Sequence, residues 1–373
     1  MPKDRSDTSD AARELILRRC HELGFARSGI ASALPPEHGD AYVNWIEQGL
    51  HGEMAYMARH VDVRLDPQRL LDGTRSVICV ADRYARPGRD RRTDQAAGRI
   101  ARYARGEDYH RSMKKRLQTL ADELRQANPD AEFRVCVDTA PVLEREFATR
   151  AGLGAVGKNT MLIAPGEGSY LLLGEVLTTL DLTSSRHVPK DPCASCTRCL
   201  DACPTQALTP WRMDATRCIS YLTIEHRGHI DPALFAAMGD WIFGCDICQE
   251  VCPHNQPTRR SASLQVHATY ASERNGFDLL NVLGWSEEDR RAAFTKSSMK
   301  RAKLDPMRRN AVIAAGNVLN AGRGDAHLRR RLAEIADDET EPELVRRTGA
   351  EVLARLDESA PDLGAAGGVS RNR

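Results

Sequence analysis

Hydrophobic and polar positions along the first half of the chain change period several times, which predicts helices and strands in turn. Residues 9–24 carry apolar side chains at helical spacing and end at Gly24, a common residue at a helix stop. Short apolar runs bounded by polar or turn-forming residues predict strands. The further elements expected are a helix at 108–127 and strands at 76–81, 133–137, 160–163 and 170–177. Strands that alternate with helices favour an α/β domain over residues 1–185.

The composition of the second half changes twice. A polar stretch at 183–191 is typical of a linker, and a cysteine-rich segment follows it. The remainder is charged and helical, and Arg308–Ala311 recurs 38 residues later as Arg346–Gly349. A period of about 40 residues is typical of HEAT repeats, although two unrelated helices with similar starts give the same weak pattern. The boundaries predict an α/β domain 1–185, a ferredoxin-type domain 186–260, a helical HEAT-like domain 261–360 and a disordered tail 361–373.

Charge is balanced over the whole chain but not along it. The 373 residues include 53 Lys and Arg against 52 Asp and Glu, and the net charge of +1 argues against a uniformly basic nucleic-acid binder. Residues 290–309 nevertheless hold eight Lys and Arg and one acid, whereas residues 334–358 hold nine acids and three Arg. The first range is either a docking surface for an anionic partner or an ordinary solvated helix face.

The chain shows no pattern of membrane insertion or export. No apolar run approaches the ~20 residues that span a bilayer, and the start lacks the apolar core of a secretory signal. We therefore expect a cytoplasmic protein, in a reducing compartment where clustered Cys residues favour metal or redox chemistry. Nothing in the sequence demands more than a monomer.

The cysteines form the most specific motif. Eight of the eleven lie between Cys193 and Cys252, in a bacterial ferredoxin run followed by a second run whose missing member is Cys218. The last Cys of such a run ligates the other cluster, so the eight thiolates divide into two crossed sets. The sets expected to hold two [4Fe–4S] clusters are Cys193, Cys196, Cys199 and Cys252, and Cys203, Cys218, Cys245 and Cys248.

Structural zinc is the alternative for paired Cys-x-x-Cys motifs, but three Cys at successive two-residue gaps followed by Cys-Pro suit cubanes better. Cys79 and Cys136 lie inside apolar strand runs and are expected to be buried small hydrophobic residues, as is Cys20. Two adjacent clusters form a path for electrons. Such a path implies a terminal redox centre, which we expect in the α/β domain.

Two motifs in that domain are candidates for a ligand site. Gly152, Gly154 and Gly157 match the dinucleotide-binding pattern, but they follow a helical segment and precede a strand, so a nicotinamide cofactor is not expected. Asp138 directly follows strand 133–137, and the carboxyl ends of strands are where α/β sheets bind ligands. From its position alone, Asp138 is equally well explained as a proton donor and as the cap of the next helix.

Five segments, in order along most of residues 50–320, resemble the epoxyqueuosine reductase family of iron–sulfur and cobalamin enzymes that complete queuosine on tRNA. The segments are GEMAYMARHVDVRLDP (52–67), RYARGEDYH (102–110), VDTAPVLEREFATRAGLGAVGKNTMLI (137–163), RCISYLTIEHRG (217–228) and GCDICQEVCPHN (244–255). Together with the first cysteine run, they make the match far more specific than a ferredoxin motif alone.

The resemblance implies an oxidoreductase that reduces epoxyqueuosine to queuosine at the wobble position of tRNA, with cobalamin held in the α/β domain. It also implies that Asp138 is the proton donor. Some family members carry a Cys near the stretch that is Ala101–Tyr103 here; this chain has none, so a role for such a thiol is not supported. The cobalamin contacts carried over from the family are Arg59, Tyr103, Asp138, Lys158, Asn159, Ser220 and Tyr221.

Under this hypothesis, electrons pass through the clusters to cobalamin, and Asp138 protonates the alkoxide that forms as the epoxide opens. That role requires burial to raise the pKa of Asp138. Residues 290–309 become the expected contact surface for tRNA phosphates. Two alternatives stay open: a reductive-dehalogenase-like corrinoid enzyme acting on a small molecule, and a non-enzymatic electron carrier or nucleic-acid-binding iron–sulfur protein. The electron donor is not identified by the sequence.

Overall fold

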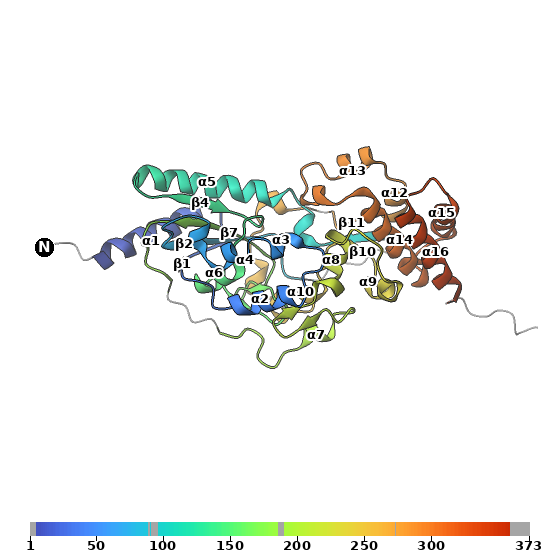
Figure 1. Cartoon of the computed structure of the whole chain (residues 1–373), viewed down its shortest axis with the longest axis horizontal. Helices are drawn as coiled ribbons and strands as arrows, with labels where there is room; N and C mark the ends of the chain where they lie inside the picture. Colours follow the sequence, from blue (N-terminus) through green and yellow to red (C-terminus); the bar gives the residue numbers. More distant parts are fainter. Residues whose placement is uncertain (1–4, 89, 91–95, 186–189, 273, 359–373) are drawn as a thin grey trace, which may run out of the picture.

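The computed structural model describes residues 5–88, 90, 96–185, 190–272 and 274–358. Figure 1 shows an elongated molecule with a sheet and its helices towards the N-terminal end and a group of helices at the C-terminal end. The expected tail 361–373 and part of the expected linker, 186–189, lie outside the described residues. None of the described helices is both long and apolar enough to cross a membrane.

A four-stranded sheet organises the N-terminal part. Its order is β1-β2-β7-β4, and every neighbouring pair is antiparallel. Three strands confirm the expected ones, whereas β1 has no counterpart among them because its sequence, RSGIAS, shows little apolar pattern. The rule for the carboxyl ends of parallel strands therefore does not explain the place of Asp138, which follows an edge strand. The strands are β1 (Arg27–Ser32), β2 (Ser76–Arg83), β4 (Phe133–Cys136) and β7 (Leu171–Thr178).

Helices cover both faces of this sheet, which gives an α/β sandwich of three layers. α1 and α5 pack on one face, against Ile78 and Val80 of β2, and confirm the two predicted helices. α6 packs on the other face, against Val77 and Cys79. All eight residues of β2 are buried because alternate side chains enter the two opposite cores. The helices here are α1 (Arg5–Glu22), α2 (Gly39–Glu47), α3 (Ala55–Ala58), α4 (Val61–Leu65), α5 (Tyr109–Ala127) and α6 (Glu144–Arg150).

The strand expected at 160–163 is confirmed as a two-residue strand outside the main sheet. β6 (Leu162–Ile163) pairs with β5 (Ala155–Val156). Of the glycines in the dinucleotide-like pattern, Gly152 and Gly154 lie between α6 and β5 and Gly157 directly follows β5, so none of them opens a helix. Gly154 is needed for close packing, since a Cβ there would stand 2.4 Å from the carbonyl oxygen of Ile163.

The cysteine-rich segment is built from short elements. These are α7 (Arg198–Asp201), β8 (Leu208–Thr209), β9 (Arg212–Met213), α8 (Ile219–Ile224), α9 (Phe235–Met238), β10 (Trp241–Phe243) and α10 (Ile247–Glu250). β10 joins a three-stranded sheet, of order β10-β3-β11, with β3 (Ala97–Ile100) and β11 (Gly276–Asp278). This small sheet therefore connects residues from all three expected domains.

Among the residues described after the cysteine-rich segment, six α-helices follow: α11 (Arg259–Ala262), α12 (Leu279–Leu283), α13 (Glu287–Ala293), α14 (Leu304–Asn320), α15 (Ala326–Asp337) and α16 (Glu343–Glu358). α14 is buried along most of its length, and its Val312 shares one hydrophobic core with Ile219 and Ile242 of the cysteine-rich segment. The two arginine pairs of the sequence repeat occupy different surroundings, because Arg309 is buried and the side chain of Arg347 is 58% exposed.

Candidate active site

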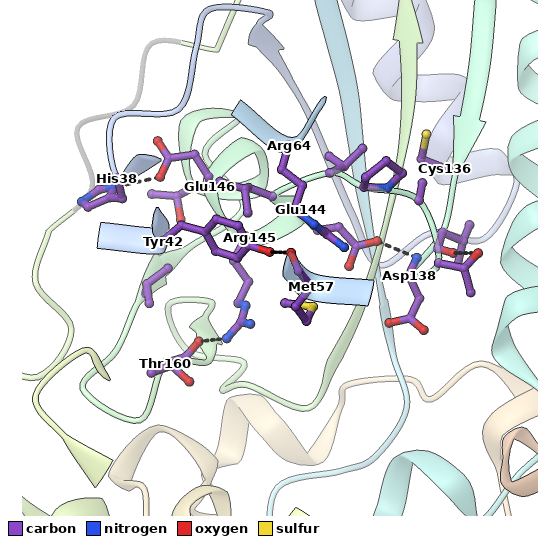
Figure 2. A pocket seen from close by; sticks show the side chains of 18 of the residues that line it. His38, Tyr42, Met57, Arg64, Cys136, Asp138, Glu144, Arg145, Glu146 and Thr160 are labelled. Atoms are coloured by element: carbon purple, nitrogen blue, oxygen red, sulfur yellow. Dashed lines mark hydrogen bonds and ion pairs between the residues drawn. The ribbon is translucent and has the colours of Figure 1, made fainter. Parts of the chain in front are cut away.

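A cavity of about 2020 Å³ opens beside the end of β4. Sites for drug-sized ligands span roughly 300–1,000 Å³, so this cavity suits a larger ligand or two ligands together. Figure 2 shows it from close by, with Asp138 and Glu144 on one side and Tyr42 and His38 on the other. Its walls come from α2, α3, residues 134–146, the β8–β9 turn and the 3₁₀ turn η7 (Ser298–Arg301).

Asp138 lies on the wall of this cavity in an unusual backbone conformation. Its φ is 55°, in the left-handed region, and the N–H of Thr139 donates back to the carbonyl of Val137 at 2.6 Å. The main-chain N–H of Asp138 donates to Oε1 of Glu144 at 2.6 Å. The Asp138 side chain is 40% exposed, and its Oδ2 lies 2.9 Å from Nε2 of His110. The residue is therefore held at its main chain and at its carboxylate.

His110 connects two carboxylates. Its Nδ1 lies 2.7 Å from Oδ1 of Asp108, and its Nε2 faces Asp138. A carboxylate at each ring nitrogen favours the doubly protonated imidazolium, because each ring N–H then has an acceptor. Burial lowers the pKa of His110, but its hydrogen bonds to Asp138 and Asp108 outweigh that effect and raise it.

The pKa of Asp138 moves in the opposite direction from the one expected. Burial by itself raises this pKa, but the hydrogen bond and the charge of His110, helped by Arg301, hold it below its ordinary value. The expectation that burial raises the pKa of Asp138 is thus wrong, because position in the sequence did not reveal a cationic neighbour. The two opposite shifts favour the proton on His110, one hydrogen bond away from Asp138.

Two further carboxyl groups lie near Asp138, and sequence reasoning missed both. Burial, and then the charge of Asp138, raise the pKa of Glu144 to about 7. Glu175, on β7, is fully buried, and neither of its carboxyl oxygens has a hydrogen-bond partner among the described residues. Burial, followed by the charges of Glu144 and Asp138, raises the pKa of Glu175 well above its ordinary value. A single acid inside an apolar strand was the available signal for Glu175.

Three polar atoms of the cavity wall are buried without a hydrogen-bond partner in the described part of the chain. They are Nε of Arg64, Oγ1 of Thr149 and Oγ of Ser298. Buried polar groups are nearly always paired in proteins, so these atoms are suited to a polar ligand or to water. The donor set fits a large group that carries amide or phosphate oxygens.

Of the seven contacts carried over from the family, Asp138 is the one that lines this cavity. Lys158 and Asn159 instead reach the cysteine-rich segment: Nζ of Lys158 donates to the carbonyl of Ala194 at 2.7 Å, and Nδ2 of Asn159 approaches the carbonyl of Cys248 at 3.4 Å. The remaining four lie elsewhere: Arg59 is exposed after α3, Tyr103 packs against Tyr109 and Phe243, Ser220 is in α8, and the Tyr221 hydroxyl accepts the N–H of Glu53.

Several thiols of the cysteine-rich segment lie near other members of the same expected set. Burial, then the neighbouring thiols of Cys193 and Cys252, raise the pKa of Cys199. Cys218 and Cys245 form part of the other group, since burial and then Cys248 and Cys218 raise the pKa of Cys245. No set of three His, Cys, Asp or Glu side chains in the described ranges is gathered as closely as one bound ion needs. In a cubane each cysteine sulfur binds a different iron atom, so the sulfurs stand further apart than four sulfurs bound to one zinc ion with Zn–S bonds of about 2.3 Å.

The other three cysteines are buried, as expected: Cys20 and Cys79 have no exposed surface, and Cys136 is 2% exposed. Cys136 nevertheless borders the cavity, just before Asp138. Its thiol is not an available nucleophile, because burial raises its pKa to about 12.

Only some of the basic residues in the range 290–309 are exposed to solvent. Arg308 pairs with Glu341 at 2.6 Å, and the buried guanidinium of Arg309 donates to three main-chain carbonyls, so these two residues hold α14 in place. The prediction of a continuous basic patch is wrong for them. The five exposed cations are Arg291, Lys296, Lys300, Arg301 and Lys303. Lys300 and Arg301 also line the cavity, as do Arg111 and Lys114 of α5.

Comparisons with known proteins match both parts of this description. The family model "Epoxyqueuosine reductase QueG, DUF1730" matches residues 64–139, and "4Fe-4S double cluster binding domain" matches residues 192–255. The epoxyqueuosine reductase of Cyclobacterium marinum is 38% identical over 311 residues, which cover 81% of this chain and 96% of the relative. That of Synechocystis is 41% identical over 288 residues, covering 76% and 98%.

Solved structures agree. An epoxyqueuosine reductase with an epoxyqueuosine-modified tRNA stem loop is 28% identical, with a TM-score of 0.82 over 93% of this chain and 91% of that one. The Bacillus subtilis enzyme, whose catalytic aspartate loop is swung out of its active site, is 26% identical, with a TM-score of 0.77 over 95% and 96%. The identity and coverage of the curated relatives, together with the double-cluster cysteines, show that this chain belongs to the epoxyqueuosine reductase family.

Proposed function

We propose that this protein reduces epoxyqueuosine to queuosine at the wobble position of tRNA, the last step of queuosine biosynthesis. The position of Asp138 carries the proposal. It lies, with its His110 proton source, on the wall of a large cavity that is bordered both by exposed cations and by Asp191 and Pro192, next to Cys193. Relatives bear the name of this activity, and a similar structure holds an epoxyqueuosine-modified stem loop.

The crossed thiol groups are proposed to hold one [4Fe–4S] cluster each. Cys193, Cys196, Cys199 and Cys252 would ligate the first, and Cys203, Cys218, Cys245 and Cys248 the second. The two groups are close enough to influence each other, which supports electron transfer between them. The thiol of Cys199 helps to raise the pKa of Cys248, after the larger effects of burial, Cys218 and Asp246. Lys158 also contacts the first ligand set, because its main-chain N–H donates to Sγ of Cys193 at 3.3 Å.

The cavity is proposed to hold cobalamin, which the volume and the unpartnered polar atoms of Arg64, Thr149 and Ser298 fit. When bound, cobalamin would supply a low-valent cobalt reductant. The chain itself would contribute the enclosing walls, the exclusion of water and the link through Lys158 and Asn159 to the cluster-bearing segment. The other carried-over contacts, Arg59, Tyr103, Ser220 and Tyr221, are not needed for this arrangement.

Asp138 and His110 are proposed to act as one acid. In the described geometry His110 holds the proton and Asp138 the negative charge. As the epoxide C–O bond breaks, the proton held by His110 would move to Asp138 across their 2.9 Å contact, and Asp138 would pass it to the developing alkoxide. Because the pKa of Asp138 is lowered, little of its carboxyl group is protonated, and His110 supplies the proton that Asp138 lacks.

The tRNA is proposed to dock by its phosphates on the exposed cations of η7 and of α5 at the cavity mouth, Lys300, Arg301, Arg111 and Lys114. The modified nucleotide would leave its stack to enter the cavity. We also propose that α14, α15 and α16 form the HEAT-like unit of a C-terminal RNA-binding domain, 261–360, beside the ferredoxin-type domain 186–260 and the catalytic domain 1–185. The alternative function, a corrinoid reductase of a small molecule, does not explain these four cations, because a small substrate has no phosphate backbone to bind.

The test uses anaerobically purified protein with cobalamin, a strong chemical reductant such as dithionite and epoxyqueuosine-tRNA, and measures queuosine in the digested RNA. Asp138→Asn is expected to keep about eight Fe per chain and its tRNA affinity, while kcat falls at least ~100-fold. Asp130→Asn, the same change at an exposed position before β4, is the control and keeps wild-type activity. Full turnover by Asp138→Asn contradicts the role of Asp138, and absence of queuosine with the wild type contradicts the function.

A further inference from the structure

The backbone at Asp138 needs a restraint. A non-glycine residue with φ of 55°, closed by an i to i+2 hydrogen bond from Thr139 to Val137, is a rare and strained turn. Strained turns persist when surrounding contacts fix them. The side-chain contact of Asp138 with His110 fixes the carboxylate, but it leaves the peptide between Val137 and Asp138 free to rotate unless its N–H is held.

Glu144 supplies the contact that holds this peptide. Its Oε1 accepts the N–H of Asp138 at 2.6 Å. Glu144 is the first residue of α6, so the helix fixes its Cα, and the N-terminal end of the helix favours a negative side chain. Figure 2 shows the Glu144 carboxylate reaching the main chain of Asp138, while the Asp138 carboxylate points away from it.

The neighbouring residue on α6 is committed elsewhere. The Arg145 guanidinium donates to the carbonyl of Thr160, on the far side of the cavity wall from Asp138. Glu144 is therefore the residue of α6 whose side chain contacts the turn at Asp138 in the described hydrogen bonds.

We propose that Glu144 is a positioning residue, which fixes the left-handed turn at Asp138 by accepting its main-chain N–H and thereby aims the Asp138 carboxylate at His110 and the cavity. The proposal deepens the proposed function and rests on it for the chemistry. It adds a residue of the cavity wall that acts through the main chain of Asp138.

The charges around Glu144 make its hydrogen bond to the Asp138 N–H depend on the protonation of Asp138. Asp138 and Glu175 face it as acids, and Arg145 and His110 as cations. An ionised acceptor makes a stronger hydrogen bond to N–H than a neutral one. The negative charge of Asp138 disfavours the ionised form of Glu144. When Asp138 takes up a proton, that charge is lost and Glu144 ionises more easily. The hydrogen bond from the Asp138 N–H to Glu144 is then strongest when Asp138 is ready to donate its proton.

The experiment compares Glu144→Ala, Glu144→Asp and Glu144→Gln with the wild type, and uses Glu132→Ala, an exposed residue just before β4, as the control. Two quantities are measured: hydrogen exchange of the main-chain amide of Asp138, in protein with its clusters, and kcat and KM on epoxyqueuosine-tRNA. Gln keeps an acceptor oxygen at the same reach, Ala has none, and the shorter Asp side chain cannot reach the amide.

Exchange at Asp138 is expected to rise at least about tenfold in the Ala and Asp variants, and kcat to fall about 10–100-fold with KM within about twofold, as loss of one hydrogen bond to a charged group predicts. The Gln variant is expected to lie between the wild type and Ala in both quantities, because it keeps an acceptor oxygen that is neutral and therefore weaker. The Glu132→Ala control is expected to match the wild type. Unchanged exchange in both the Ala and the Asp variant overturns the proposal. So does a Gln variant as slow as Ala, because that result assigns Glu144 an acidic role instead. The exchange result stands even if the wild type proves inactive on tRNA, so failure of the proposed function is seen separately.

Discussion

Glu175 is a buried acid without a partner, and it makes a quantitative prediction. The residue lies in the middle of β7, opposite Cys79 of β2 and Cys136 of β4 in the strand register, with no exposed surface. Neither carboxyl oxygen is hydrogen-bonded among the described residues. A charge in such a place is far too costly, so the folded protein keeps Glu175 neutral.

The cost of keeping Glu175 neutral follows from its ordinary pKa of 4.5. In the unfolded chain at pH 7 the carboxyl is ionised, and protonating it costs about 1.4 kcal/mol for each pH unit above that pKa, or about 3 kcal/mol in total. Because the folded state binds the proton and the unfolded state does not, the free energy of unfolding falls as pH rises from 4.5. Glu175→Gln is always neutral and removes this loss. Allowing about 1 kcal/mol for its unpaired amide, we expect a net gain of about 2 kcal/mol at pH 7.

The assay is anaerobic thermal unfolding at one scan rate between pH 5 and pH 8, together with infrared detection of a protonated carboxyl group. Glu175→Gln should be close to the wild type at pH 5, more stable at pH 8, and should lack the protonated-carboxyl band that the wild type keeps at pH 8. Glu167→Gln is the matched control, since Glu167 is buried but paired with Arg27 and Arg83. Its loss should destabilise the protein, because breaking a buried pair leaves charges uncompensated. Equal pH slopes in the wild type and Glu175→Gln would refute the argument.

Three further predictions concern the clusters, the surface and the acid pair. Cys196→Ser should lower iron from about eight to about four per chain, by metal analysis, without unfolding the protein. Lys300→Ala should lower tRNA affinity and reduce the slope of log Kd against log salt by about 0.7–0.9, with no change in Tm, whereas Arg309→Ala should lower Tm because three carbonyls lose their donor. His110→Gln should lower the Tm most between about pH 4 and pH 6.5. The lowered pKa of Asp138 stabilises the folded state above its ordinary value of 3.8, and the raised pKa of His110 stabilises it fully below 6.5.

The sequence predicts the elements that carry a strong local pattern. The runs at 76–81 and 170–177 are apolar over their whole length because both faces of the sheet are covered, and the structure confirms them as β2 and β7. β1 escapes prediction because its pairing with β2, rather than its own side chains, makes it a strand. The cysteine spacing predicts the crossed grouping of the thiols for a comparable reason, since ligand geometry restricts the spacing along the chain.

Surface charge is harder to predict than ligand spacing. Arg308 and Arg309 look like the rest of the basic range 290–309 in sequence, yet both are buried. Arg308 donates to the carbonyl of Leu283 in α12, and Arg309 points into the interface between α14 and the cysteine-rich segment. Helical periodicity alone cannot tell an arginine that donates to buried carbonyls from one that faces solvent. Three-dimensional neighbours decide it, and those neighbours, such as Leu222 and Leu283, are distant in sequence.

The pKa values of the site lie beyond sequence reasoning for the same reason. Asp138, His110 and Glu144 come from three different elements, and the charge on each depends on the other two. Burial alone predicts a raised pKa for Asp138, which suits a proton donor, but the histidine across the cavity wall reverses the sign. What remains raised is the pKa of Glu144, whose carboxyl is turned to the main chain. In the proposed mechanism the three residues have separate roles: His110 stores the proton, Asp138 passes it to the substrate in the cavity, and Glu144 holds Asp138 in its left-handed turn.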